Sequence, residues 1–277
     1  MIPTHQSERT KDTKVVVNQL STLTEYDFSN PHRHDYFEFF CFVNGGGKHE
    51  IDFTDVPIQS YSMHVVAPGQ VHCVSRDLDS NGFVFLFQLE GLQAPKEVAG
   101  FLFDHICHDL EHRIPEYLVP EGKYQWFETV LDTIWEDFNS ESHYSALQVR
   151  AGIQQLCLKC MEWDNQDSPL FSNDYAQFRR MLFQEFRSKK KVKDYAAALN
   201  MTEKTLNEMV KEHTGSSASR IIYDQIVLEA KRLLLTGITA KEAAYDLGFD
   251  DPAHFSKFFK AQTGQSPSEF RNVHVEG

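Results

Sequence analysis

The stretch that decides the fold runs from Lys241 to Arg271 and reads KEAAYDLGFDDPAHFSKFFKAQTGQSPSEFR. Just before it, Thr239 is placed to cap a helix that ends at Leu247, and Gly248 begins a turn. Pro252 then stands near the first turn of a second helix, where proline is favoured. Three phenylalanines recur on that helix at the spacing of one buried face, which predicts a helix-turn-helix unit: Phe255, Phe258 and Phe259.

A similar unit precedes this one. Residues 192–199 are predicted to form a helix with an apolar stripe that ends at Leu199, Asn200 and Met201 make a turn, and Thr202 can cap the helix that follows. The buried face of that second helix is predicted from Leu206, Met209 and Val210. An imperfect repeat of this kind predicts two modules in tandem, joined by a long helix over residues 219–235. Arg232 on this joining helix is expected to help fix the angle between the modules.

The second helix of a helix-turn-helix unit presents its exposed face to the major groove of DNA. In the first module the residues free to do so are Lys204, Thr205, Asn207, Glu208 and Lys211. In the second module they are Ala253, His254, Ser256, Lys257 and Lys260. Lysine and polar side chains suit phosphates and base edges. The basic run Ser188–Lys191, which leads into the first module, is also expected to contact phosphate.

The C-terminal third of the chain, above all residues 241–271, resembles the AraC/XylS family of transcription regulators. The resemblance implies two helix-turn-helix motifs that enter adjacent major grooves on one face of the DNA. Glu208 departs from the family pattern, which often has a basic or neutral polar residue there. An acid at this position repels phosphate, so Glu208 either accepts from a cytosine amine or faces solvent. The alternative is a generic helical bundle.

Charge is divided unevenly along the chain. The net charge is −13, which by itself argues against nucleic acid as a partner. From Phe178 onward, however, 16 Lys and Arg residues stand against 13 Asp and Glu, and upstream the counts are 11 and 27. The DNA-reading end is therefore mildly basic and the front is acidic. The polar N-terminus and the lack of an 18-residue apolar run predict a cytoplasmic protein with no membrane partner. Five scattered cysteines indicate free thiols.

The front half contains short apolar runs separated by turn residues, at 15–17, 36–43, 47–53, 62–67 and 82–89. Turns are expected at residues 44–47 and 67–69, which are rich in glycine and proline. Several short strands at this spacing predict an antiparallel barrel or sandwich. Such a barrel can hold one small ligand.

A histidine-rich pattern lies within these strands: His32, His34 and Glu38, followed by Gly45 and later by His72. It resembles the two motifs of the cupin fold, which implies a cupin-like barrel. In metal-dependent cupins these positions hold a metal, so the same four residues are the metal candidates here. In sensor domains of AraC-type regulators the histidines can instead persist without metal, and no metal or cofactor is predicted. The predicted effector site consists of His32, His34, Glu38, Phe39, His64, His72 and Arg76; Cys41 and His49 are further lining candidates.

Helical segments follow the barrel. Residues 101–110 are expected to be helical, and His105, His108 and His112 lie on roughly one face, which is expected to be solvated. Residues 123–139 and 142–163 each carry an apolar stripe. One of these helices can cover the barrel while the other pairs with a second subunit, and the family resemblance favours a homodimer; alternatively both stripes close the domain's own core. Cys157 and Cys160 form a CxxC within a helix, which is interpreted as core cysteine.

These observations predict a two-domain α+β protein: a cupin-like effector-binding and dimerisation domain (1–163), a linker (164–173) and an all-α DNA-binding domain (174–277). The predicted function is sequence-specific transcription regulation, with activation the outcome implied by the family. The expected partners are double-stranded DNA, a small effector such as a sugar or another metabolite, a second subunit and RNA polymerase. No catalytic residue is predicted. The alternatives are a metal-dependent cupin enzyme with an accessory helical domain, and a DNA-binding protein controlled only by a protein partner, with a solidly packed barrel.

Overall fold

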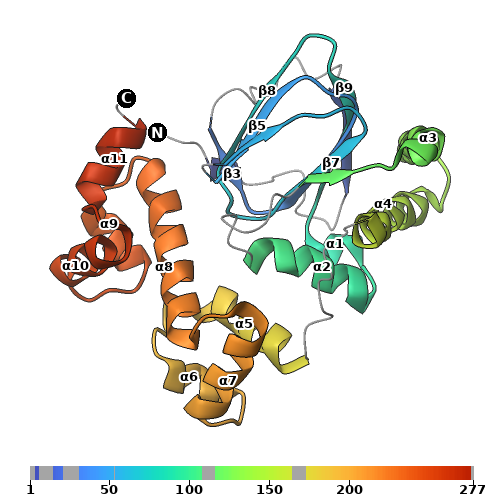
Figure 1. The fold of residues 1–277 in the computed structure, drawn as a ribbon. Helices are drawn as coiled ribbons and strands as arrows, with labels where there is room; N and C mark the ends of the chain where they lie inside the picture. The colour runs from blue at the N-terminus through green and yellow to red at the C-terminus, as the bar shows by residue number, and fades with distance from the viewer. Residues whose placement is uncertain are drawn as a thin grey trace. The chain divides into compact units, whose positions relative to one another are not determined.

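The structure is a computed structural model, and it describes residues 4–5, 15–20, 31–52, 54–107, 116–163 and 173–275. The chain divides into two compact units, one spanning Pro3–Asp167 and the other comprising Ser168–Gly277 with Met1–Ile2. The first contains strands and helices, and the second contains helices (Figure 1). The two-domain α+β prediction is thereby confirmed. Residues 164–172 of the predicted linker lie outside the described residues.

The strands of the first unit form two principal sheets. The strands are β1 (Thr4–His5), β2 (Val16–Gln19), β3 (Arg33–His34), β4 (Phe37–Asn44), β5 (Gly47–Ile51), β6 (Thr54–Pro57), β7 (Ser62–Val66), β8 (His72–Arg76), β9 (Asn81–Phe87) and β10 (Glu116–Leu118). The larger sheet has the antiparallel order β10-β7-β4-β9-β2 and the smaller has the order β6-β5-β8. β1 pairs with β3 in parallel. An isolated bridge between His32 and His72 links the region of β3 to β8.

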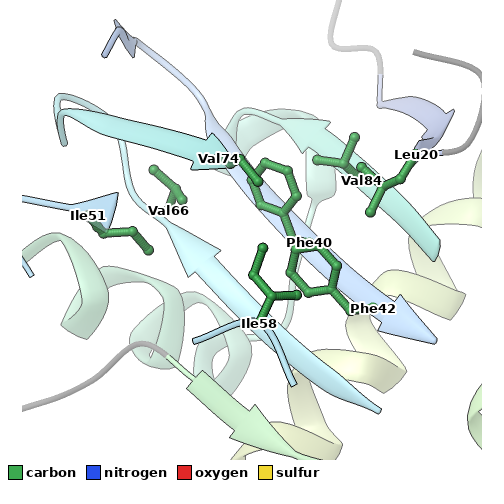
Figure 2. Packing of buried hydrophobic residues seen from close by; sticks show 8 residues of the cluster. All are labelled: Leu20, Phe40, Phe42, Ile51, Ile58, Val66, Val74 and Val84. Carbon is green, nitrogen blue, oxygen red and sulfur yellow. The ribbon is translucent and has the colours of Figure 1, made fainter. Parts of the chain in front are cut away.

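The core of this unit lies between the two sheets. Phe40 and Phe42 project from β4 toward Ile51 and Val74, which come from the smaller sheet (Figure 2). Side chains alternate along a strand, so residues 38, 40 and 42 of β4 share this interior face while 37, 39 and 41 share the outer one. The described strands therefore form two facing sheets; their hydrogen bonds do not close a barrel.

Helices cover the outer face of the larger sheet. They are α1 (Leu89–Leu92), α2 (Lys96–Cys107), α3 (Tyr124–Asn139), preceded by the 3-10 turn η3 (Glu121–Lys123), and α4 (Ser145–Trp163) (Figure 1). The predicted helices at 123–139 and 142–163 are confirmed within a few residues. The predicted helix at 101–110 starts earlier, at Lys96; the side chain of His105 and all of His108 and His112 lie outside what is described.

The CxxC cysteines of α4 are core residues, as predicted. Cys157 and Cys160 are fully buried, and Cys160 Sγ lies 3.7 Å from Met63 Sδ of β7. Burial raises the pKa of the Cys157 thiol, which keeps it protonated. Cys41 lies on the outer face of β4, and its own burial, together with the nearby Cys157, raises the pKa of its thiol. These thiols contribute packing between the sheet and its covering helix.

The second unit consists of seven helices among the described residues: α5 (Asn173–Glu185), α6 (Val192–Ala198), α7 (Glu203–Thr214), α8 (Ala218–Leu235), α9 (Ala240–Asp246), α10 (Pro252–Thr263) and α11 (Pro267–Val275). The long helix α8 has α5, α6 and α7 at one end and α9, α10 and α11 at the other (Figure 1). Two tandem helix-turn-helix modules, α6–α7 and α9–α10, are therefore present as predicted. Helix α11 was not foreseen; it packs on α8, and Phe270 contacts Phe259 of α10.

The internal repeat extends to the helix caps. Thr202 accepts from the amide of Thr205 at the start of α7, and Thr239 forms a complete capping box with Glu242 at the start of α9. At the other ends, α7 and α10 both finish in a left-handed glycine, Gly215 and Gly264. The predicted apolar stripes are also found, since Leu206, Val210, Phe255 and Phe259 are fully buried.

Candidate DNA-binding surface and effector site

The second helix of each module presents a polar face to solvent. On α7, Lys204, Thr205 and Lys211 are exposed, and on α10 the exposed residues are Ala253, His254, Lys257 and Lys260. Their apolar neighbours hold each helix against α8 and the first helix of its own module. A rigid helix with a polar outer face has the form needed to enter a major groove.

The sequence predicted that the Asn207 side chain is free to contact DNA, but it is engaged within the domain. Its side-chain oxygen accepts from the backbone amide of Ala218 at 3.0 Å, and its Nδ2 donates to the carbonyl of Glu203 at 3.0 Å. The amide of Ala218 is one of the unsatisfied donors in the first turn of α8, so Asn207 stabilises the start of that helix. Spacing alone placed Asn207 on the open face, because nothing in the sequence shows that the next helix begins beside it.

Two other residues predicted to contact DNA, Ser256 and Glu208, interact with neighbouring groups of their own helix. Ser256 is half-buried and its hydroxyl donates to the carbonyl of Pro252 at 2.9 Å, one helical turn back. Glu208 is exposed and lies 3.8 Å from Lys204 Nζ on the same face of α7. This ion pair partly offsets the repulsion that Glu208 would exert on a phosphate. The outer face of α10 therefore has more uncompensated positive charge than that of α7.

The basic lead-in at residues 188–191 only partly fits its predicted role. Lys189 pairs with Glu185 and Lys191 is exposed, but the ammonium of Lys190 is engaged within the domain. Lys190 Nζ donates to the carbonyls of Arg187 and Gly248 at 2.5 and 2.8 Å. Two of the three ammonium hydrogens of Lys190 are directed at backbone oxygens, so a phosphate contact at this position stays a prediction.

The interior of the first unit holds a buried cluster of six polar side chains. They are His32, His34, Glu38, His49, His64 and His72, each at most 1% exposed. Four of the rings form a continuous chain of nitrogen contacts: His34 Nε2 to His72 Nε2 at 3.0 Å, His72 Nδ1 to His49 Nε2 at 3.1 Å, and His49 Nδ1 to His64 Nδ1 at 3.2 Å. Phe40 and Phe42 lie against these rings. We call this set the histidine cluster.

One contact fixes the proton at the His34 end of this chain. His34 Nδ1 lies 2.7 Å from the carbonyl of Tyr36, and a carbonyl only accepts, so Nδ1 carries the proton. With neutral rings, His34 Nε2 then accepts from His72, His72 Nδ1 accepts from His49, and His49 Nδ1 accepts from His64. Neutral rings agree with burial, which lowers the pKa of His49 and of His64.

Glu38 is the exception within the histidine cluster. It is fully buried, and neither carboxylate oxygen has a hydrogen-bond donor among the described residues. Its Oε2 lies 3.6 Å from His34 Nε2 and 3.5 Å from His72 Nε2. A buried carboxylate without donors is costly unless it is protonated or meets a cation.

The donor atoms around Glu38 fit a transition metal. His32, Glu38 and His72 each offer a ligand atom, all within 4.8 Å of one another, and His34 Nε2 lies 3.0 Å from His72 Nε2. Ligand atoms bound tetrahedrally at about 2.1 Å are separated by about 3.4 Å, and Glu38 Oε2 lies 3.6 and 3.5 Å from the Nε2 atoms of His34 and His72. Imidazole nitrogens with one carboxylate suit zinc, iron, manganese or nickel. A bound ion would supply the positive charge that Glu38 lacks.

Two predicted effector residues, Phe39 and Arg76, and the lining candidate Cys41 do not face the histidine cluster as free side chains. Phe39 points away from the histidine cluster, because β4 alternates and its ring meets Phe85 on the outer face. Cys41 shares that face and is excluded for the same reason. Arg76 shares the inward face of β8 with His72, but its guanidinium donates to the carbonyls of Ser80 and Leu20 at 2.9 and 2.7 Å. The residues that sequence reasoning missed are Phe40 and Phe42; alternation places them on the same side of β4 as Glu38, but it does not determine which side faces the histidines.

A separate cavity of about 340 Å³ lies where β9 meets α3. Its lining is mixed: Glu128, Asp132, Gln19 and Asn81 are polar, whereas Val43, Phe83 and Leu131 are apolar. Glu128 accepts a hydrogen bond from the Tyr61 hydroxyl at 2.6 Å. This cavity is not part of the histidine cluster, and no sequence motif indicated it.

Comparisons with known proteins agree with the helical modules. Residues 195–272 match a family model described as a helix-turn-helix domain. The HTH-type transcriptional activator RhaS of Enterobacter sp. (strain 638) is 24% identical over 253 residues, covering 87% of this chain and 86% of RhaS. The arabinose operon regulatory protein of Escherichia coli (strain K12) is 30% identical over 134 residues, or 47% of this chain and 46% of the relative. ToxT from Vibrio cholerae, a solved structure, is 14% identical with a TM-score of 0.44, and the match covers 95% and 98% of the two chains.

Tandem helix-turn-helix modules with polar second helices define a DNA-binding transcription regulator. Residues 195–272 carry the helix-turn-helix domain that the C-terminal motif indicated, and these relatives support the resemblance to AraC/XylS regulators. These relatives are named as transcription regulators, which favours a regulator over the cupin-enzyme alternative. Among the described helices, none is long and apolar enough to span a membrane.

Proposed function

We propose that this protein is a cytoplasmic, sequence-specific transcription activator whose two modules enter consecutive major grooves of one DNA duplex. The observation that carries the proposal is the pair of polar faces on α7 and α10, displayed by helices that pack on one connecting helix, α8. The base-reading residues are Lys204, Thr205, Lys211, Ala253, His254, Lys257 and Lys260. Activation, which implies contact with RNA polymerase, is proposed from the printed function of RhaS.

Substitution on α10 tests this assignment. Lys257→Ala and His254→Ala should each weaken binding to a duplex that the wild-type protein selects from a random pool, by about 1–3 kcal/mol where the side chain reads a base. The measurement is fluorescence anisotropy with the full chain. Lys231→Ala, on α8, serves as a control that removes the same charge away from the recognition helices. Wild-type affinity in both α10 variants would refute this role for α10.

We further propose that the first unit is a cupin-like effector domain and that the effector binds at the histidine cluster. Six buried polar groups converge between the two sheets. Burying so many polar groups costs folding free energy, which favours a role for them in ligand binding. The effector residues are His32, His34, Glu38, His64 and His72, with His49 added. The effector would act by favouring one arrangement of the DNA-binding units over another.

The second candidate for the ligand is a divalent transition metal. The Glu38 carboxylate favours it, because that group has no donor among the described residues and lies between two imidazole nitrogens. Native mass spectrometry of untagged protein purified without chelator tests both candidates. Added mass of one metal ion that Glu38→Gln abolishes would support the metal, whereas added organic mass would support a metabolite. A clean apo mass that stays unchanged after incubation with zinc, nickel or manganese would refute the metal.

We propose that a homodimer forms through α3 and α4. Large apolar side chains remain exposed on or next to these helices: Phe138, Tyr144, Leu147 and Leu158. Leu147 and Leu158 lie on α4 itself, outside the buried stripe that contacts the sheet. Replacing both with glutamate should convert a dimer to a monomer in analytical ultracentrifugation, because charges at an apolar contact are costly. An unchanged sedimentation coefficient would argue against this interface.

A further inference from the structure

The two helix-turn-helix modules meet at a second place besides helix α8. Residues 186–191, which connect α5 to α6, lie against the turn between α9 and α10. Lys190 Nζ donates to the carbonyl of Arg187 within this connection and to the carbonyl of Gly248 in the turn of the second module. The ammonium also lies 5.1 Å from the centroid of the Phe249 ring. One side chain therefore ties the backbone of one module to the backbone of the other.

The surrounding contacts leave little room for the two modules to separate or turn. Gly248 has a φ of +68°, and a Cβ at this position would lie 2.1 Å from the Arg187 carbonyl oxygen. The Arg187 side chain pairs with Glu229 of α8 at 3.3 Å, and Glu229 lies 3.5 Å from the buried Arg232. We call these five residues the inter-module joint: Arg187, Lys190, Glu229, Arg232 and Gly248.

A joint of this kind changes what the connecting helix must do. Long helices bend, and a bend in α8 would rotate one recognition helix relative to the other. Consecutive major grooves repeat about every 34–36 Å along the duplex, so a rotated helix would miss its groove. A second attachment away from the α8 axis removes that rotation. It also explains why a lysine near the DNA-binding surface has its charge directed inward, where burial lowers its pKa against the opposing influence of Asp250.

We propose that Lys190 is a positioning residue that fixes the separation of the two recognition helices, so that the domain accepts one spacing between its two half-sites. The inference rests on the proposed function, since it requires both modules to contact one duplex. Lys190 contributes through the carbonyls that it bridges and needs no contact with DNA. Arg232, which the sequence indicated as fixing the inter-module angle, acts in the same joint through Glu229.

The test compares Lys190→Met with Lys191→Met in the full chain. The two substitutions remove the same charge from neighbouring positions, but Lys191 is exposed and makes no side-chain hydrogen bond or ion pair that is recorded among the described residues. The probes are a duplex selected by the wild-type protein from a random pool and the same duplex with one base pair inserted or deleted between its half-sites. Affinity is measured by fluorescence anisotropy over a series of salt concentrations.

Lys190→Met should bind the selected duplex about tenfold more weakly and discriminate less among the three spacings. Its salt dependence should equal that of the wild type, because no phosphate contact is lost. Lys191→Met should keep the wild-type spacing preference. Lys190→Arg, which can still donate to both carbonyls, should restore it in large part. Circular dichroism of each variant establishes that the helices are folded.

Three results would overturn the inference. A salt slope for Lys190→Met reduced by about one would make Lys190 a phosphate contact. An unchanged spacing preference in folded Lys190→Met would show that α8 alone sets the separation. If Lys190→Met does not fold, Lys190→Gln, which keeps one donor group, takes its place. An unchanged spacing preference in Lys190→Gln would then overturn the inference. Failure of the wild-type protein to select any duplex would instead refute the proposed function, and this inference with it.

Discussion

Gly248 stands at a position where backbone conformation and packing both require glycine. Its φ of +68° is left-handed, and the Arg187 carbonyl oxygen occupies the space of a side chain. The neighbouring module therefore constrains this turn as much as local geometry does. Asn207 shows the same dependence on a neighbour, because its amide completes the first turn of α8. Residue type and spacing identified both positions, but their roles come from contacts with distant segments.

Gly248→Ala should destabilise the DNA-binding unit by about 3 kcal/mol or more, since it adds a collision with backbone to the cost of a left-handed alanine. Gly215→Ala is the matched control, with a φ of +71° and no atom within 4 Å of the added Cβ. That variant should lose only about 1 kcal/mol. Urea unfolding followed by circular dichroism measures both. Equal losses would mean that the turn moves away from Arg187 at little cost.

Helix ends are the elements that the sequence predicted most directly. The capping box of α9 is complete: Thr239 Oγ1 accepts from the amide of Glu242 at 3.2 Å, and the Glu242 carboxylate accepts from the amide of Thr239 at 2.7 Å. These reciprocal bonds satisfy two of the amide donors that a helix leaves open. Hydrogen bonds from Thr239 to the carboxylate lower the pKa of Glu242. The first helix of the second module is therefore stabilised most when Glu242 is ionised.

Thr239→Ala should cost about 1 kcal/mol at neutral pH. Because the folded-state pKa of Glu242 is depressed, its contribution is present above the ordinary carboxyl pKa and is lost as pH falls through the folded value. The difference in stability between wild type and Thr239→Ala should accordingly shrink from pH 7 to pH 3. Urea unfolding at both pH values measures it. A difference that stays constant would assign the whole effect to the threonine hydroxyl.

The whole molecule combines two units with different kinds of interior. The DNA-binding unit has a core of aromatic and aliphatic side chains around α8, whereas the first unit buries five histidines and a glutamate between its sheets. The buried histidines make the stability of the first unit depend on pH. Burial is the largest cause that lowers the pKa of both His49 and His64, so the folded state favours their neutral forms.

Acidification should therefore destabilise the first unit selectively. A histidine whose folded-state pKa is depressed contributes stability above its ordinary value of 6.5, and this stability is lost as pH falls toward the folded value. Hydrogen exchange at pH 7.5 and pH 5.5, corrected for intrinsic exchange rates, should show lost protection in β4, β5 and β7 while α8 keeps its protection. His64→Phe should reduce the pH dependence. Equal loss in both units would contradict a local origin in the histidines.

The sequence by itself determined the tandem modules, their caps, their buried stripes and the short strands of the first unit. These features depend on periodicity and on local hydrogen bonds, which neighbouring residues specify. Only the tertiary structure decided which side of β4 faces the histidines, that Asn207 serves α8, and that Lys190 bridges two carbonyls. The two sheets likewise arise from pairings between strands far apart in the chain. Such contacts depend on where distant segments come to lie, and no local pattern of residues specifies that.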